Sequence, residues 1–194
     1  TCEIIVVDNA SGDGSRDMIE EEFLNRHSGN QSVDRRTEHP ESEILKQVQN
    51  DKRDSGQARM TKGVRIIQNK ENLGFAKGCN IGAKAAKGKY ILFFNSDTEV
   101  LDSGFLKMTE FLERNEKIGI LGGKLLNIDG SRQPSAGKFY TLFNLFSMLV
   151  GAEVFLGIRK SPNTISKVDW VSGALMMVKK SLFEKLSGFD ENFF

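Results

Sequence analysis

Short apolar runs alternate with polar segments along the chain, and this alternation predicts strands and helices in turn. Residues 3–7 are rich in β-branched side chains and lead into a polar, glycine-containing segment at 8–15. This pattern predicts a buried strand followed by a turn. A helix is expected next, at about 16–25, with Ser15 as its N-cap and Asp17 in its first turn.

The segment at 27–62 has a different composition. It contains no aromatic residue and few aliphatic ones, and charged residues of both signs are spread through it. Such a segment buries too little apolar area to offset the entropy cost of ordering it. We therefore interpret it as a polar insertion, disordered or partly helical, in which 42–54 suits a short surface helix.

Two further strands are expected after the insertion, at Val64–Gln68 and Tyr90–Phe94. The second is apolar throughout, which is typical of a central strand covered on both faces. Between them, small and apolar residues recur at helical spacing. We therefore expect a helix at about 76–86 with Gly88 at its C-cap.

The remaining pattern continues this alternation. We expect a helix at 103–115, strands at 118–121 and 124–127, an apolar helix at 139–158, a strand at 168–178 interrupted at Gly173, and a helix ending near 186. The whole pattern predicts an α/β fold, a mostly parallel sheet flanked by helices, in a single domain over 1–194. In such a sheet, ligands bind where the strands end.

Composition narrows the class of protein. The chain has 194 residues, 27 basic and 26 acidic, and its net charge of +1 argues against a nucleic-acid partner bound through bulk charge. Two cysteines and two histidines supply neither a disulfide framework nor many zinc ligands, which fits a reducing cytoplasm. The histidines lie in the polar insertion and are assigned no catalytic role, and Cys79 is interpreted as a small core residue.

Polar residues follow two of the predicted strands. Asp8 and Asn9 come after the first, and Asn95 and Asp97 come after the strand at 90–94. The fold places these strand ends on one edge of the sheet, so we expect Asp8 and Asp97 to converge. Asp97 suits Mg²⁺ or Mn²⁺ held together with substrate phosphates. The alternative is that Asp97 only forms the turn or caps the following helix.

Asp8 suits a hydrogen bond from a nucleobase ring N–H, and Asn9 a contact to ribose; the alternative is an ordinary Asx turn. The segment 72–80 places glycines and an asparagine at a helix start, where N–H groups face an anion or a base. As a bare glycine loop it is weak evidence. The apolar segment at 139–158 contains Asn144 and a glutamate, which favours an amphipathic or core helix over a membrane-spanning one.

Trp170, the only tryptophan, suits a platform for a sugar ring, with Gly173 allowing an acceptor to approach closely. The alternative is a core tryptophan next to a glycine that kinks the strand. Nothing in the pattern around these two residues decides between the two interpretations.

Five segments together resemble the family 2 glycosyltransferases, in particular the rhamnosyltransferase-like branch that builds bacterial surface polysaccharides. They are 4–15, 72–82, 90–97, 168–174 and 188–194, in the family's order. The resemblance implies a GT-A fold and inverting transfer of a sugar from a UDP- or dTDP-linked donor to a saccharide or lipid-linked acceptor. It also implies a cytoplasmic enzyme, at the inner face of the plasma membrane, with peripheral membrane association.

The resemblance also implies roles for individual residues. Asn95 and Asp97 fill the family's DxD position, with Asn95 in place of the first aspartate, and Asp97 holds the metal, Mg²⁺ or Mn²⁺. On the sugar-donor side the resemblance places Asp8, Asn9, Asn72, Gly74, Asn95 and Asp97, and on the acceptor side Trp170, Gly173 and Ala174.

The apolar ends of the chain lead us to expect an internal piece of a longer protein. The family's first strand then lies before Thr1, and the general base lies after Phe194, because Asp190 and Glu191 match positions that precede it. The piece alone is therefore expected to be inactive. Two alternatives stay open: a catalytically dead fragment that binds nucleotide-sugar weakly, and a nucleotidyltransferase on a similar scaffold.

Overall fold

The computed structural model describes residues 2–19, 64–151 and 158–193. The chain forms two compact units, the first made of Thr1–Ile91 and Lys180–Phe194 and the second of Leu92–Lys179. The predicted polar insertion at 27–62 lies outside the described residues. The single domain over 1–194 stays a prediction.

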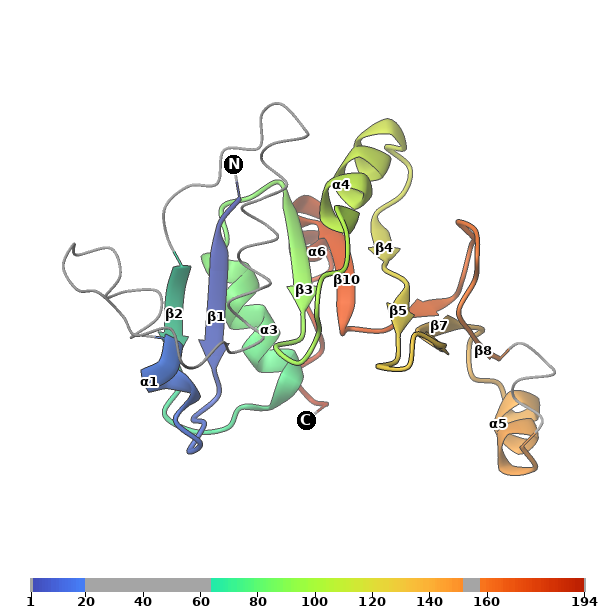
Figure 1. Ribbon diagram of the computed structural model, residues 1–194, viewed down its shortest axis with the longest axis horizontal. Coiled ribbons are helices and arrows are strands. Elements are labelled where there is room, and N and C mark those ends of the chain that lie inside the picture. Colours follow the sequence, from blue (N-terminus) through green and yellow to red (C-terminus); the bar gives the residue numbers. More distant parts are fainter. Residues whose placement is uncertain (1, 20–63, 152–157, 194) are drawn as a thin grey trace. The chain divides into compact units, whose positions relative to one another are not determined.

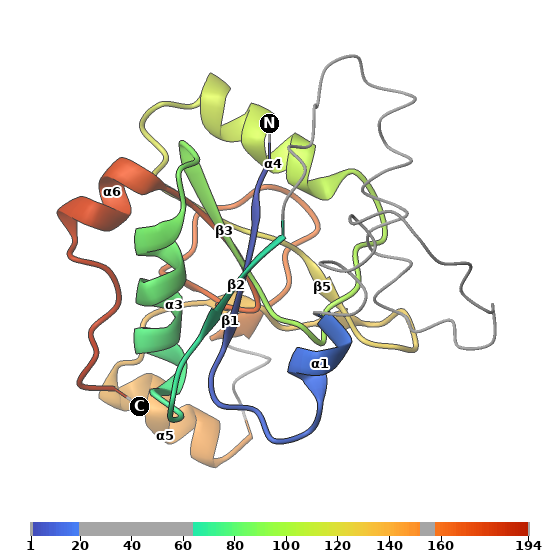
Figure 2. The ribbon, with the colours of Figure 1, turned by 90° about the vertical axis from the view of Figure 1, so that its left-hand side faces the viewer.

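The first unit is built on two parallel strands with a helix beside them. Strand β1 (Ile4–Asp8) pairs with β2 (Val64–Gln68) in the register that sets Asp8 opposite Gln68. Helix α3 (Gly74–Ala85) lies alongside β1 (Figures 1 and 2). The contact is close because Gly82 has no side chain: a Cβ there would lie 3.0 Å from a Val7 methyl group. Both predicted strands are confirmed.

The first helix begins one residue away from its predicted cap. Helix α1 (Ser15–Ile19) contains Ser15 as its first residue, and the Met18 N–H donates to the Gly14 carbonyl at 3.1 Å. The Ser15 N–H and hydroxyl both donate to Asp13 Oδ1, at 3.0 and 2.6 Å. The N-cap assignment of Ser15 is therefore wrong, because its hydroxyl serves the preceding turn. The rest of the helix predicted to residue 25 lies outside the described residues.

The end of α3 also differs from the prediction. The C-cap is Ala86, in an extended conformation with its N–H bonded to the carbonyls of Gly82 and Ala83, so the assignment of Gly88 is wrong. An extended C-cap needs no left-handed residue and hence no glycine. The predicted turn at Gly188 is confirmed: it follows α6 (Lys180–Lys185) with φ at 80°, and its N–H bonds to the Phe183 carbonyl.

A three-stranded sheet has the order β3-β10-β4. Its strands are β3 (Tyr90–Phe94), β10 (Leu175–Lys179) and β4 (Ile120–Gly122), and β10 runs antiparallel to β4. Strands β3 and β10 are joined at both ends by backbone hydrogen bonds. The Lys180 N–H donates to the Lys89 carbonyl at one end, and the Asn95 N–H donates to the Ala174 carbonyl at the other. Because the start of β3 lies beside the end of β10, these strands also run in opposite directions.

The prediction of a mostly parallel sheet is not confirmed, because among the described strand pairs only β1–β2 is parallel. An apolar run predicts burial but carries no signal for strand direction. The central position predicted for β3 is wrong for the described sheets: β3 lies at the end of its sheet. Its burial alternates, with Ile91 and Phe93 buried and the other three residues of the strand half-buried.

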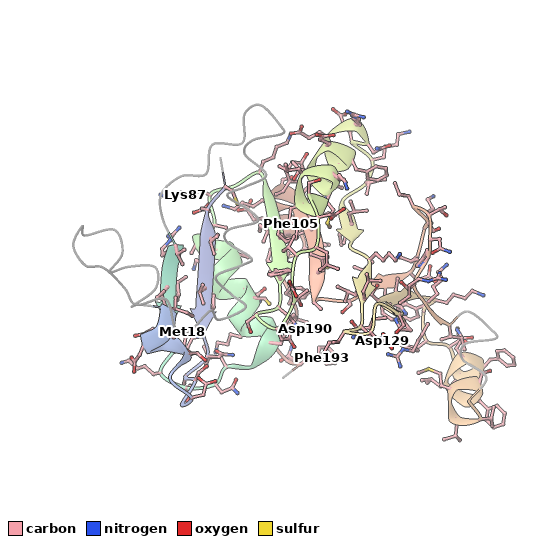
Figure 3. All side chains as sticks on the ribbon, viewed as in Figure 1. Met18, Lys87, Phe105, Asp129, Asp190 and Phe193 are labelled. Atoms are coloured by element: carbon pink, nitrogen blue, oxygen red, sulfur yellow. The ribbon has the colours of Figure 1, made fainter. Side chains whose placement is uncertain are left out.

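Helix α4 (Gly104–Arg114) packs its apolar face into the core of the second unit. Met108 and Leu112 are buried, Leu112 fully, as the spacing predicts. The predicted helix is confirmed, with Ser103 and Asn115 as its caps. Phe105, labelled in Figure 3, meets Phe94 of β3 edge to face at 5.4 Å.

Short strands complete the second unit. They are β5 (Leu125–Leu126) paired with β6 (Arg132–Gln133), and β7 (Ala136–Gly137) between β8 (Arg159–Lys160) and β9 (Trp170–Val171). The strand predicted at 168–178 is two strands in different sheets, β9 and β10. The predicted interruption is confirmed, because a turn at Gly173 and Ala174 separates them.

The helix predicted at 139–158 is shorter in the described residues. Helix α5 (Leu142–Leu149) has eight residues and is followed by Gly151 at φ 73°; residues 152–157 lie outside the described part. Ile158 is fully buried just before β8. Within the described ranges, no helix combines the length and the apolar character needed to cross a bilayer.

Candidate functional site

Asn9, just after β1, is the centre of an amide network. Its Nδ2 donates to Asn72 Oδ1 at 3.2 Å and to the Gly74 carbonyl at 3.1 Å. Its Oδ1 accepts from Asn69 Nδ2 at 2.8 Å and from the Leu73 N–H at 3.4 Å. The structure therefore brings together three predicted sugar-donor residues, Asn9, Asn72 and Gly74, from segments about sixty residues apart.

This network fixes the start of α3. Asn72 Oδ1 also accepts from the Gly74 N–H at 3.0 Å, and Gly74 has φ at 79°, a conformation that favours glycine. Because both polar atoms of the Asn9 side chain are used inside the protein, Asn9 acts as a structural link between two loops. Its contact to ribose stays a prediction.

Asp8 lies at the last position of β1 and is half-buried. Its Oδ1 accepts from the Ser11 N–H at 3.0 Å, which is the Asx-type turn considered as the alternative. Its second carboxylate oxygen has no hydrogen-bond partner among the described residues. The turn and a contact to a ligand are thus compatible, because they use different oxygens.

The turn after β3 is held by backbone hydrogen bonds. The Asn95 N–H donates to the Ala174 carbonyl at 3.1 Å, and the Thr98 N–H donates to the Asn95 carbonyl at 3.2 Å. Asp97, inside this turn, is exposed, and its carboxylate has no hydrogen bond or ion pair with any described residue. Because α4 begins only at Gly104, Asp97 is not its cap. The structure brings Asn95 and Ala174 together.

Trp170 is packed on two sides. Its ring stacks on Tyr140, with centroids 6.1 Å apart, and its Nε1 donates to the Lys138 carbonyl at 2.9 Å. The ring also fills the space beside Gly137, where a Cβ would lie 2.7 Å from it. Trp170 remains half-exposed. Its predicted role as a sugar platform is therefore confined to the part of the ring that these contacts leave open.

Asp97 is not part of a dedicated metal cage in the described part of the chain. No group of three or more His, Cys, Asp or Glu residues that could hold a metal ion occurs among the described residues. Asp97 and the amide oxygen of Asn95 supply hard oxygen ligands, and Mg²⁺ is often held by only one or two carboxylates together with water and substrate phosphates. The residues present fit a metal that arrives with a diphosphate.

Asn80 of α3 holds the C-terminal segment, and the sequence analysis assigned it no role. Its Oδ1 accepts from the Phe189 N–H at 2.8 Å, and its Nδ2 donates to the Phe189 carbonyl at 2.9 Å and to Glu191 Oε1 at 3.0 Å. A Cβ on Gly188 would collide with the Asn80 amide. Asn80 lies in the same segment as Asn72, at 72–82, but its partners are 109 and 111 residues away, so the neighbouring sequence gives no signal for these bonds.

The predicted site residues divide between the two units. The first unit contains Asp8, Asn9, Asn72 and Gly74, and the second contains Asn95, Asp97, Trp170, Gly173 and Ala174. The convergence of Asp8 with Asp97 stays a prediction. A hollow at the end of α4 is lined by residues 113–118 and contains none of the predicted site residues.

Comparison with known proteins identifies the family. Residues 33–186 match the model for glycosyl transferase family 2, so the chain belongs to this family. Membership implies the GT-A α/β fold class and an enzyme of the glycosyltransferase type, and it confirms the predicted resemblance to this family.

Two relatives agree with this assignment. The O-antigen biosynthesis protein RfbC of Myxococcus xanthus is 28% identical over 127 residues, which cover 59% of this chain and 9% of the relative. A protein of Haemophilus influenzae named an uncharacterized glycosyltransferase is 35% identical over 68 residues, 35% of this chain and 21% of the relative. The chain thus matches only a small part of the length of either relative.

Proposed function

We propose that this domain transfers a sugar, with inversion, from a UDP- or dTDP-linked donor to a saccharide or lipid-linked acceptor. The proposed process is the synthesis of bacterial cell-surface and cell-wall polysaccharide, in the cytoplasm at the inner face of the plasma membrane. The family match carries the proposal, and the relative named for O-antigen biosynthesis supports the link to polysaccharide.

The proposed sugar-donor contacts follow the two loops. The open carboxylate oxygen of Asp8 accepts a hydrogen bond from a ring N–H of the base. Asn72 and Gly74 line the nucleotide, and Asn9 holds their loop in place through the hydrogen bonds of its amide. The half-buried position of Asp8 supports this role, because a partly desolvated carboxylate binds an N–H more strongly than an exposed one does.

The proposed metal contacts belong to the turn after β3. Asp97, with Asn95, would hold Mg²⁺ or Mn²⁺ against the diphosphate, and this cation would neutralise the charge that develops on the leaving group. The backbone bonds that anchor the turn at Asn95 support this role, because a ligand on an anchored turn needs little ordering when substrate binds. Trp170, Gly173 and Ala174 line the acceptor side in this proposal.

Binding of the sugar donor can be tested by thermal shift on the 194-residue chain. A UDP- or dTDP-sugar should raise the melting temperature more in the presence of Mg²⁺ or Mn²⁺ than in EDTA, because a ligand that binds only the native state stabilises it. At saturating ligand the gain is about 2–3 kcal/mol, a shift of several degrees.

Two aspartate variants make the test specific. Asp97→Ala should abolish the metal-dependent part of the shift. Asp129→Ala, in the exposed turn of the same unit before β6, should leave it intact (Figure 3 labels Asp129). Metal-dependent binding that is undiminished in Asp97→Ala would remove Asp97 from the metal site. Transfer itself is measured on the full-length protein, as nucleoside diphosphate released only when a saccharide acceptor is added.

A further inference from the structure

Helix α5 turns its apolar face to solvent. The residues on the opposite side, Asn144, Ser147 and Met148, are buried or half-buried. Figure 1 draws α5 beyond β8, and Figure 3 shows its side chains projecting outward from the helix. The exposed apolar residues are Leu142 at 87%, Phe143 at 67%, Leu145 at 50%, Phe146 at 64%, Leu149 at 83% and Val150 at 63%.

These six side chains form one face. At 3.6 residues per turn they cover an arc of about 160°, and the three inward residues lie outside this arc. A surface helix of a soluble domain has the reverse arrangement, with its apolar stripe on the core. Exposed apolar area of this extent marks a binding surface. We call this set of six residues the α5 face.

The polar side chains of α5 and of its N-cap form hydrogen bonds within the helix region itself. The Thr141 hydroxyl accepts from the Asn144 N–H at 3.2 Å, and Asn144 Nδ2 donates to the Phe139 carbonyl at 2.7 Å. The Ser147 hydroxyl donates to the Phe143 carbonyl at 2.8 Å. Because the polar groups are already paired, the α5 face needs a partner that offers hydrocarbon and no hydrogen bonds.

We propose that α5 lies in the surface of an anionic lipid bilayer, with the α5 face inserted among the acyl chains. Eight residues span about 12 Å, far less than the ~30 Å of a bilayer core, so this helix suits an orientation parallel to the membrane plane. Tyr140, at the entry to the helix, is exposed and is of an aromatic type that is enriched at the membrane–water interface. Phe139, just before it, is an exposed apolar side chain.

Charge identifies the lipid as anionic. Residues 139–150 contain no charged side chain. Exposed basic residues stand at the end of the β7–β8 pair nearest the helix, Lys138 after β7 and Arg159 at the start of β8, and they outnumber Asp169, whose carboxylate accepts the Phe139 N–H there. The two basic residues are held close, since Gly137 pairs with Arg159 and the Lys138 N–H donates to the Ile158 carbonyl. Basic residues at this position attract phosphate headgroups, by about 1 kcal/mol each, a roughly fivefold gain in partition.

A second copy of the chain fits the same face less well. Specific protein interfaces carry about one hydrogen bond per 100–200 Å² and a polar rim. The α5 face offers only hydrocarbon. In a symmetric dimer, Lys138 and Arg159 beside it would also be repelled by the same positive charges of the second copy. The membrane proposal does not depend on the identity of the transferred sugar or on catalysis, so its failure and that of the proposed function are separable.

The test is sedimentation of the 194-residue chain with vesicles of pure phosphatidylcholine and of phosphatidylcholine mixed with phosphatidylglycerol. The chain should bind the mixed vesicles more tightly, and added salt should weaken this binding. The double variant Leu142→Gln/Phe146→Gln should partition at least about tenfold less, because two large apolar side chains are lost from the bilayer. Arg159→Gln should lower the partition onto the mixed vesicles about fivefold and leave the partition onto pure phosphatidylcholine unchanged.

Matched variants elsewhere in the second unit serve as controls. Ile128→Gln removes an apolar side chain that is equally exposed but lies in the turn between β5 and β6, and Lys117→Gln removes an exposed positive charge near α4. Both should bind vesicles like the unaltered chain. Equal partition of the double variant and the unaltered chain would overturn the proposal. So would a failure to bind vesicles together with self-association that the double variant abolishes, since a second copy would then occupy the face.

Discussion

The predicted site residues divide into a first half in the first unit and a second half in the second unit, and each half is held in place in a different way. In the first unit, side-chain amides tie the loops together, with Asn9 bonded to Asn69, Asn72 and Gly74. In the second unit, backbone bonds hold the turn that contains Asp97. The first half therefore depends on the identity of its side chains for its shape, whereas the second leaves the Asp97 side chain free to bind.

This difference shows that a polar residue of a motif can serve either the fold or the binding of a ligand. The asparagines of the first half are explained by structure before any ligand is considered, because each bond joins segments that must meet. Asp97 has no structural partner among the described residues, so the fold gives no reason for a carboxylate at that position. Substitutions should accordingly reduce stability in the first half and binding in the second.

Adding a side chain at Gly137 should produce the largest loss of unfolding free energy. Gly137 lies in the middle strand of β8-β7-β9, and a Cβ there would meet the Ile158 carbonyl and the Trp170 ring. Gly137→Ala should therefore cost about 3 kcal/mol of unfolding free energy, measured by urea denaturation. Gly12→Ala, at a site with nothing within 4 Å, is the control and should cost far less. Equal stability of the two variants would contradict the close packing described for β7.

Removing the Asn9 amide should produce the next largest loss of unfolding free energy. Asn9→Ala removes four hydrogen bonds and should lower the unfolding free energy by about 2–3 kcal/mol. Asp97→Ala, the matched variant of the second half, should change it by less than about 0.5 kcal/mol. If the two variants unfold at the same urea concentration, the contrast between the halves is wrong.

Loss of the ring contact on Trp170 should have a smaller effect. Tyr140→Ala removes a stacked partner 6.1 Å away and should cost about 1 kcal/mol beyond the area it exposes. Because Trp170 is the only tryptophan, its fluorescence emission should shift to longer wavelength as its ring becomes more hydrated. Tyr140→Phe keeps the stacking and should leave both the stability and the emission unchanged.

The smallest effect concerns the thiol of Cys79 on α3. Burial raises the pKa of Cys79 to about 11, because a thiolate is poorly solvated there. In a Cys2→Ser background, alkylation of the folded chain should be slow at neutral pH and rise about tenfold per pH unit below this pKa. Asn9→Ala should speed the reaction by loosening α3 from β1. Rapid labelling of the Cys2→Ser chain at neutral pH would contradict the raised pKa and the half-buried position of Cys79.

Local patterns predicted local structure well. The β-branched run at Val64–Gln68 and the apolar run at Tyr90–Phe94 are strands with the predicted bounds, and α4 lies within the helix predicted at 103–115. The errors arose where two local signals compete. Ser15 is a good cap residue, but Asp13 lies two residues before it and binds its hydroxyl instead.

Long-range relations were not predictable from the sequence. The antiparallel pairing of β3 with β10 joins segments about eighty residues apart, and an apolar run gives no direction. The hydrogen bonds of Asn9 with Asn72 and of Asn80 with Phe189 also join segments far apart in the chain, 63 and 109 residues respectively. The inward turn of Asn144 and Ser147 was also hidden, because the helical pattern shows which residues share a face but not which face meets the core.

The amide network has one consequence for how this domain tolerates changes in length. The connector between Gln68 and Gly74 is held to the end of β1 by several hydrogen bonds. Asn69 is bonded to Asp8 and Asn9, and Leu73 and Gly74 are bonded to Asn9. The pairing of β1 with β2 fixes the register at the start of the connector. Inserting or deleting a single residue there would break the alignment at one end or the other. Natural variants of the domain should therefore keep the number of residues between Gln68 and Gly74 constant even where their identities change.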